Sequence, residues 1–137
     1  MTEQLGFEVR MGLPYEAALE AVTAALKVEG FGVLTRIDVR ATLKEKLGAE
    51  FRPYAILGAC NPPLAQRALS IDGWVGLMLP CNVTVEEVPQ GGSVVRIANP
   101  VMMMQVGEWQ GNERLGEVAA EARARLERVA AALGAVV

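Results

Sequence analysis

Residues 54–60, Tyr-Ala-Ile-Leu-Gly-Ala-Cys, form a short run that is apolar on both of its alternating faces. Such a run is typical of an interior strand in a sheet that is covered on both sides. It leads directly into Asn61, a favourable helix N-cap, and then into Pro62 and Pro63, which suit the first turn of a helix. The chain is therefore expected to build a sheet around this strand and to pass from it straight into a helix.

Weaker patterns on both sides of this run predict the remaining elements. Further strands are expected at residues 7–11, 32–39, 77–87 and 94–98, and helices at residues 14–30, 38–48, from 62 onward, and 112–134. Gln90-Gly91-Gly92 predicts a hairpin turn between the last two strands. Pro80 cannot donate a hydrogen bond to a strand ladder, so it is expected to mark an edge strand or a bulge.

Together these elements predict a single α+β domain over residues 1–137. We expect two layers, with helices packed on one face of a mixed, mostly antiparallel sheet of about five strands. The chain has 137 residues, which is about one domain, and hydrophobic residues make up 52% of it, enough for a substantial core. No linker, repeat or low-complexity segment divides it.

Composition excludes several classes of function. The chain contains no histidine, which rules out a Ser-His-Asp triad, a Cys-His dyad and a His-ligated zinc or haem. Its net charge of −3 does not favour phosphate backbones or anionic lipid, so we expect neither nucleic acid nor a membrane as partner. The N-terminal residues do not resemble a signal peptide, which suggests a cytoplasmic protein. Arginines outnumber lysines, which is compatible with a thermophilic source.

Two Cys-Asn pairs, Cys60-Asn61 and Cys81-Asn82, contain both cysteines of the chain. Cys60 precedes a predicted N-cap, where the positive end of the helix dipole would favour its thiolate and make it the better nucleophile candidate. Plain packing is the favoured alternative, because cysteine is among the most buried residue types. If their strands are neighbours, Cys60 and Cys81 could meet as a redox pair or as two soft metal ligands. Two ligands alone do not complete a metal site.

Met102, Met103 and Met104 follow Asn99-Pro100 and carry thioethers, which are soft ligands for copper(I). Met103 therefore joins Cys60 and Cys81 as a candidate metal ligand, although core packing or an interface is the favoured interpretation of the methionines.

Other familiar sites have less support. No glycine-rich nucleotide motif occurs, so ATP and NAD sites are not indicated. Glu86 and Glu87 should point to opposite faces of one strand, and we expect both to be solvated strand-end charges. Trp74 and Trp109, each beside a glycine, are expected to form an interface or a pocket lid.

Several segments taken together resemble a known family. They are residues 54–62, Ala65, Ala68-Leu69, residues 76–83, Asn99-Pro100 and residues 102–104. This pattern resembles the bacterial and archaeal family of domain of unknown function 302. The resemblance implies a small two-layer α+β domain that is dimeric, but no substrate. A shared site would correspond to Cys60, Asn61, Cys81 and Asn82, with Asn99 and the methionines as neighbours.

Two functions remain open at this point. The first is a cytoplasmic homodimeric domain that binds a small ligand, metal or cofactor near the two Cys-Asn segments; the sequence does not identify the cofactor. The second is a thiol-dependent redox enzyme in which Cys60 reacts and Cys81 resolves the product. The accessibility of the two sulfur atoms should distinguish between these two functions.

Overall fold

A computed structural model describes residues 5–134, and within that range the chain forms a five-stranded sheet with the order β1-β5-β4-β3-β2. The strands are β1 (Gly6–Met11), β2 (Gly32–Asp38), β3 (Tyr54–Cys60), β4 (Cys81–Glu87) and β5 (Ser93–Ala98). All four neighbouring pairs in this sheet are antiparallel. The α+β class, the number of strands and the packing of helices on the sheet agree with the sequence prediction.

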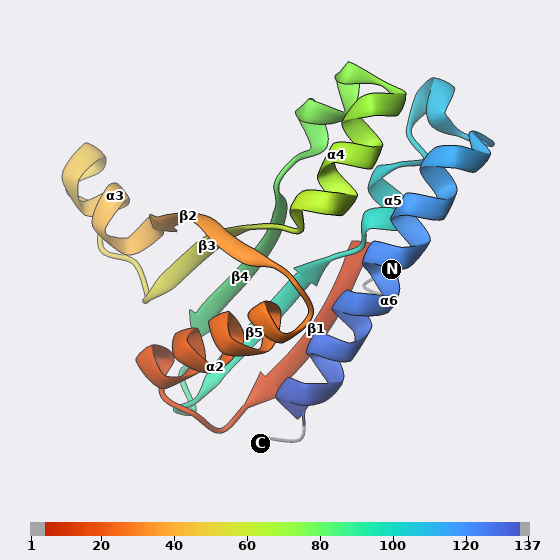
Figure 1. Cartoon of the computed structure of the whole chain (residues 1–137). Coiled ribbons are helices and arrows are strands. Elements are labelled where there is room, and N and C mark those ends of the chain that lie inside the picture. Colours follow the sequence, from red (N-terminus) through yellow and green to blue (C-terminus); the bar gives the residue numbers. More distant parts are fainter. Residues whose placement is uncertain (1–4, 135–137) are drawn as a thin grey trace.

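Two long helices cover one face of the sheet. Helices α2 (Tyr15–Val28) and α6 (Glu113–Gly134) lie side by side on it, and α3 (Val39–Leu47) extends from the end of β2 without burying any of its side chains (Figure 1). Their apolar side chains pack against those of alternate strand residues, such as Leu57, Val83 and Ile97, to form the main core. The alternation of side chains along each strand therefore separates a covered face from an open one.

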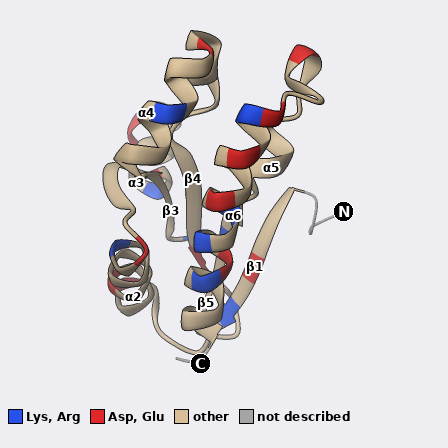
Figure 2. Cartoon of the chain, turned by 45° about the vertical axis from the view of Figure 1, so that its right-hand side comes forward, with Lys and Arg blue, Asp and Glu red and all other residues tan. Residues whose placement is uncertain are grey.

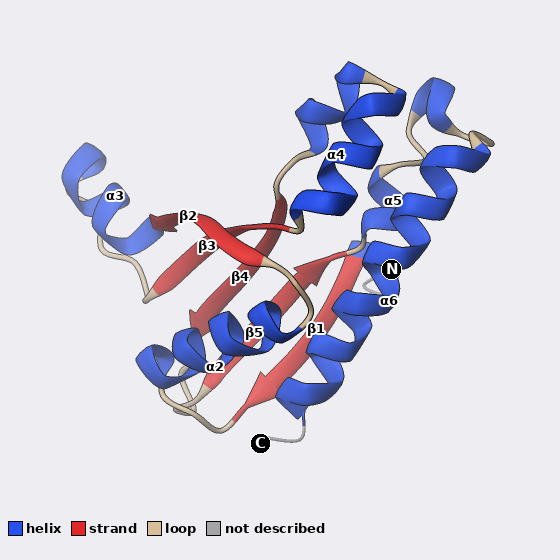
Figure 3. Ribbon diagram, viewed as in Figure 1, coloured by secondary structure: helices blue, strands red, loops and turns tan. Residues whose placement is uncertain are grey.

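A second, smaller apolar cluster lies beyond one end of the sheet. It involves α4 (Pro62–Ile71), the 3₁₀ segment η1 (Gly73–Met78), the short helix α5 (Pro100–Met103) and the segment η2 (Gly107–Trp109) (Figure 3). The first half of α6 packs here through Leu115 and Val118, and its second half packs in the main core through Leu126 and Val129. One helix thus joins the two clusters.

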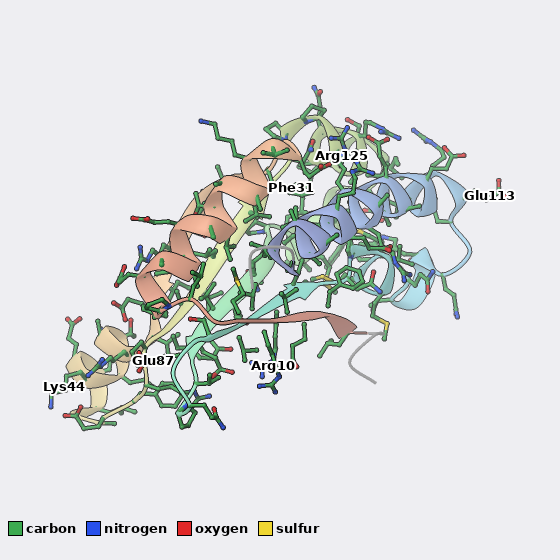
Figure 4. The ribbon with its side chains drawn as sticks, turned by 90° about the horizontal axis from the view of Figure 1, so that it is seen from below. Arg10, Phe31, Lys44, Glu87, Glu113 and Arg125 are labelled. Atoms are coloured by element: carbon green, nitrogen blue, oxygen red, sulfur yellow. The ribbon has the colours of Figure 1, made fainter. Side chains whose placement is uncertain are left out.

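The opposite face of the sheet carries no helix from the described part of the chain. Figure 4 shows α2 and α6 on one side of the sheet and Arg10 projecting from the other. Along β3, Ala55, Leu57 and Ala59 are buried, whereas Tyr54 and Ile56 on the other side are only half-buried. The expectation that this strand is interior is confirmed by the strand order, but the expectation that it is covered on both sides is wrong.

The expected strand at 77–87 is too long. Residues Gly73–Met78 form a 3₁₀ helix that begins at Asp72, whose carboxylate accepts hydrogen bonds from the backbone N–H of Trp74 and from Nε1 of Trp109. The side chain of Leu77 is consequently 74% exposed. Pro80 immediately precedes β4, an interior strand, so its predicted placement at an edge or bulge is wrong.

Charges are spread over the helical surface with both signs mixed, as Figure 2 shows along α6. Glu121 and Arg125, four residues apart on α6, form an ion pair at 3.6 Å. None of the helices in residues 5–134 is long and apolar enough to cross a membrane.

Candidate functional site

The strand register divides the candidate residues between the two faces of the sheet. Cys81 lies opposite Ala59, so its side chain belongs to the covered face. Cys60 is the next residue along β3 and starts from the open face, as does Asn82, which lies opposite Gly58. The two cysteines are thus on neighbouring strands, which was the condition for them to meet, but their side chains leave the sheet on opposite sides.

A small cavity lies where the two apolar clusters meet. It has a volume of about 40 Å³ and is lined by Cys60, Cys81, Asn61 and Met104 together with apolar side chains of α4 and α6. A water molecule needs roughly 10–15 Å³ measured in this way, so the cavity has room for only a few small atoms. We call it the cysteine cavity.

Cys81 is poorly suited to thiolate chemistry. It is 8% exposed, and burial raises the pKa of its thiol to about 11, with a smaller contribution from nearby Cys60. The protonated form therefore predominates at neutral pH, and a protonated thiol is neither a good nucleophile nor a metal ligand. Cys60 is half-buried, and both cysteines are free thiols.

Asn61 connects the start of α4 to the end of α2. Its Oδ1 accepts a hydrogen bond from the backbone N–H of Leu64 at 3.3 Å, which caps α4 as predicted. Its Nδ2 donates to the backbone carbonyl of Glu29 at 3.4 Å, and Nη1 of Arg125 donates to the same carbonyl at 3.2 Å. Both ends of the Asn61 amide therefore fasten the end of α2 to α4, and Arg125 fastens the same end of α2 to α6.

Asn99 occupies a similar position after β5. It is 4% exposed, and its Oδ1 accepts a hydrogen bond from the backbone N–H of Val101 at 3.0 Å, which caps the short helix α5. Its backbone N–H donates to the carbonyl of Leu5 at 3.0 Å. We infer a structural contribution from both capping asparagines.

A larger hollow lies on the open face of the sheet. It has a volume of about 320 Å³ and is bordered by β1, β5, β4 and α5. Its apolar lining includes Leu5, Ala98 and Met103, and its polar lining includes Asn82 and Thr84. We call it the open-face hollow. Met103 thus lines this hollow, whereas Met104 lines the cysteine cavity.

Two polar side chains of β4 in the open-face hollow have uncommitted groups. Asn82 is exposed, and its amide makes no hydrogen bond within the described residues. The Oγ1 atom of Thr84 is buried and has no hydrogen-bond partner within residues 5–134. A buried hydroxyl without a partner costs about 1–3 kcal/mol, and each such group needs a physical explanation.

One end of the open-face hollow adjoins an ion-pair cluster. Glu86 is 5% exposed, and its carboxylate accepts hydrogen bonds from Nε of Arg52 at 2.5 Å and from Nη1 of Arg96. Nε of Arg96 also donates to Glu8 at 3.0 Å. Burial acts to raise the pKa of Glu86, but the hydrogen bonds and charges of Arg96 and Arg52 together lower it below its ordinary value. The guanidinium of Arg52 also lies over the rings of Phe51 and Tyr54.

Sequence reasoning missed this cluster. The expectation that Glu86 is a solvated charge is wrong, because its partners come from the loop before β3 and from β5. Only the register of the sheet brings Arg96 next to Thr84 and Glu8. Glu86 shares the open face of β4 with Asn82 and Thr84, so the alternation of polar and apolar residues along the strand gave no sign that Glu86 is buried.

The described residues contain no group of three or more cysteine, aspartate or glutamate side chains that is placed to hold a metal ion. The proposed metal ligands Cys60 and Cys81 line one cavity and Met103 lines another, so the three do not share a single hollow.

The fold and these two hollows define a small antiparallel α+β domain with helices on one face of its sheet and a recess on the other. Residues 7–133 match the family model described as "Domain of unknown function DUF302", and the chain belongs to that family. It is similar to the crystal structure of an uncharacterized conserved DUF302 protein from Bacillus stearothermophilus, with 32% sequence identity and a TM-score of 0.80 over 94% of this chain and 95% of the other. A search of curated proteins gave no match. The family resemblance is confirmed.

Proposed function

We propose that this protein is a small-molecule binding domain and that its ligand lies in the open-face hollow, beside the second Cys-Asn segment. The observation that carries the proposal is the combination of an apolar floor with the uncommitted amide of Asn82 in a recess of about 320 Å³. Ligand sites are typically hollows of about this size or larger, lined mainly by apolar groups and oriented by a few polar ones. The cysteine cavity, at about 40 Å³, is too small to accept such a molecule without rearrangement.

The thiol-dependent alternative has less support. A resolving cysteine must approach the reacting cysteine and act as a thiolate, and the raised pKa of Cys81 opposes the second requirement. Cys60 and Cys81 both line the cysteine cavity, so it is the protonated state of Cys81, and not its distance from Cys60, that opposes this role. We therefore assign both cysteines to packing around the cysteine cavity.

A homodimer in the cytoplasm remains part of this proposal. Support for self-association comes from exposed apolar side chains on α4 and η1, where Trp74 is 71% exposed and Leu77 and Leu69 lie nearby in sequence. Aromatic residues are enriched at protein interfaces, and clustered exposed apolar groups are unusual on a monomer.

Fragment binding followed by NMR tests the location of the ligand. We expect fragments from a small aromatic library to shift backbone amide signals of β1, β4 and β5 around Asn82. Ala98→Leu, which fills the open-face hollow, should abolish these shifts, whereas Ala65→Leu, which fills the cysteine cavity, should preserve them. Shifts that cluster around Cys81 and Leu115, or that persist unchanged in Ala98→Leu, would contradict the proposal.

A further inference from the structure

The charged groups around the open-face hollow neutralise one another before any ligand arrives. Arg52 and Arg96 contribute two positive charges, and Glu8 and Glu86 contribute two negative charges. The altered pKa values of Glu86, lowered, and Arg96, raised, keep both groups ionised across the physiological range. Arg10 lies 3.7 Å from Glu8, and its side chain is 71% exposed, so solvent screens it.

This pairing determines which ligand charge the hollow can accept. A carboxylate ligand would have to displace Glu8 or Glu86 from Arg96, and an ammonium ligand would have to compete with Arg96 for Glu8. In either case the ligand would also lose its own hydration on entering an apolar recess, which is costly for a charged group. A neutral molecule avoids both costs.

The polar groups that remain free are neutral as well. The amide of Asn82 offers two N–H donors and one carbonyl acceptor, and its exposure leaves all of them accessible. Thr84 lies two residues further along the same face of β4 and also lines the hollow, and its hydroxyl has no hydrogen-bond partner within residues 5–134. A ligand amide can match the Asn82 amide with one donated and one accepted hydrogen bond.

We propose that the ligand of the open-face hollow is an uncharged, largely apolar molecule that carries a carboxamide or similar donor–acceptor group, which pairs with the amide of Asn82. This inference rests on the proposed function and narrows it to a chemical class. The apolar part of the molecule lies against Leu5, Ala98 and Met103, and its polar group points toward β4.

Three probes of nearly equal shape test the ligand class: benzamide, benzoate and benzylamine, which are neutral, anionic and cationic at pH 7. Their dissociation constants are measured by NMR titration of the full chain, from the amide signals of β1, β4 and β5. We expect benzamide to bind at least about tenfold more tightly than either charged probe, a difference of about 1.4 kcal/mol. Equal or tighter binding of benzoate or benzylamine in the hollow would overturn the inference while leaving the proposed function standing.

Variants of Asn82 test the role of its amide. Asn82→Ala is expected to weaken benzamide binding about fivefold to tenfold and to leave the weak binding of benzoate and benzylamine unchanged. Gln66→Ala, at an exposed position on α4, is the control and should change none of the three constants. An unchanged constant for benzamide in Asn82→Ala would overturn the inference. If no probe up to its solubility limit shifts signals around the hollow, both the inference and the proposed function fail.

Discussion

Glu86 shows how single residues organise the open face of the sheet. Its carboxylate is 5% exposed although no helix of the described chain covers that face, because Arg52 and Arg96 lie against it from both sides. A carboxylate that was buried without partners would be protonated or would destabilise the fold. The cluster therefore depends on the ionised form of Glu86, and it should respond to acid.

We predict that Glu86 makes the folding stability depend on pH below about 4.5. Its folded-state pKa is lowered from the ordinary 4.5, so its contribution is fully present above that value and is lost as pH falls through the folded-state pKa. Glu86→Gln should cost about 1–2 kcal/mol at pH 7, less than for a fully buried pair because both arginines are about half exposed.

Urea unfolding at several pH values measures both the pH dependence of the folding stability and the stability cost of Glu86→Gln. Glu86→Gln should also flatten the pH dependence below 4.5. The adjacent and exposed Glu87 gives the matched control, because Glu87→Gln should change the free energy of unfolding by less than about 0.5 kcal/mol. Equal effects of the two substitutions would refute the buried cluster.

Thr84 leads to a prediction of opposite sign. Thr84→Val replaces a buried hydroxyl that has no partner with a methyl group of similar shape, so it should stabilise the free protein by about 1 kcal/mol. Thr23→Val should instead destabilise it, because the Thr23 hydroxyl donates to the carbonyl of Leu19 at 2.8 Å. Thermal unfolding of the two variants measures both changes in stability. A loss of stability in Thr84→Val would show that the Thr84 hydroxyl of the unaltered protein has a hydrogen-bond partner.

At the scale of elements, the junctions between strands and helices were the most predictable features. Asn61-Pro62 ends β3 and starts α4 as expected, because both capping and the proline preference act within a few residues. The prediction of strand at residues 77–80 was wrong for a reason that is not local. Asp72 accepts a hydrogen bond from Trp109, which is 37 residues away, and this contact stabilises a 3₁₀ segment in place of the strand.

The candidate site was predictable only in part. The sequence pointed to Asn82 and Met103, which line the open-face hollow. It could not show that Cys60 and Cys81 leave opposite faces, since that depends on the pairing of Cys81 with Ala59. The partners of Glu86 depend on the register of β4 with β5 in the same way.

The double role of Asn61 can be measured. Asn61→Ala removes the cap of α4 and the hydrogen bond to the Glu29 carbonyl, so it should cost about 2 kcal/mol. Asn112→Ala removes only the cap of α6, where Oδ1 accepts from the backbone N–H of Leu115, and should cost about 1 kcal/mol. Chemical denaturation provides the comparison. If Asn61→Ala lowers the free energy of unfolding by no more than Asn112→Ala does, the hydrogen bonds of Asn61 do not stabilise the contact between α2 and α4.

For the whole molecule, helices bury one face of the sheet, and the other face carries the hollow in which we propose that the ligand binds. Helices α2 and α6 bury the covered face, and α6 joins the main core to the smaller cluster that surrounds the cysteine cavity. The open face carries the open-face hollow and a cluster of paired charges.

Self-association is predicted through α4 and η1. We expect light scattering after size-exclusion chromatography to give twice the chain mass of 14.6 kDa for the unaltered protein. The double variant Trp74→Ser/Leu77→Ser should be monomeric and still folded, because both side chains are exposed in the single chain. A monomeric unaltered protein, or a dimeric double variant, would contradict this interface.

The most direct test of the binding site is a crystal structure of the protein with benzamide. The account predicts electron density for the probe in the open-face hollow, with its carboxamide within hydrogen-bond distance of the Asn82 amide and its ring against Ala98 and Met103. Density for the probe between Cys81 and Leu115, or at any surface outside the hollow while the hollow stays empty, would contradict the assignment of the open face as the functional one.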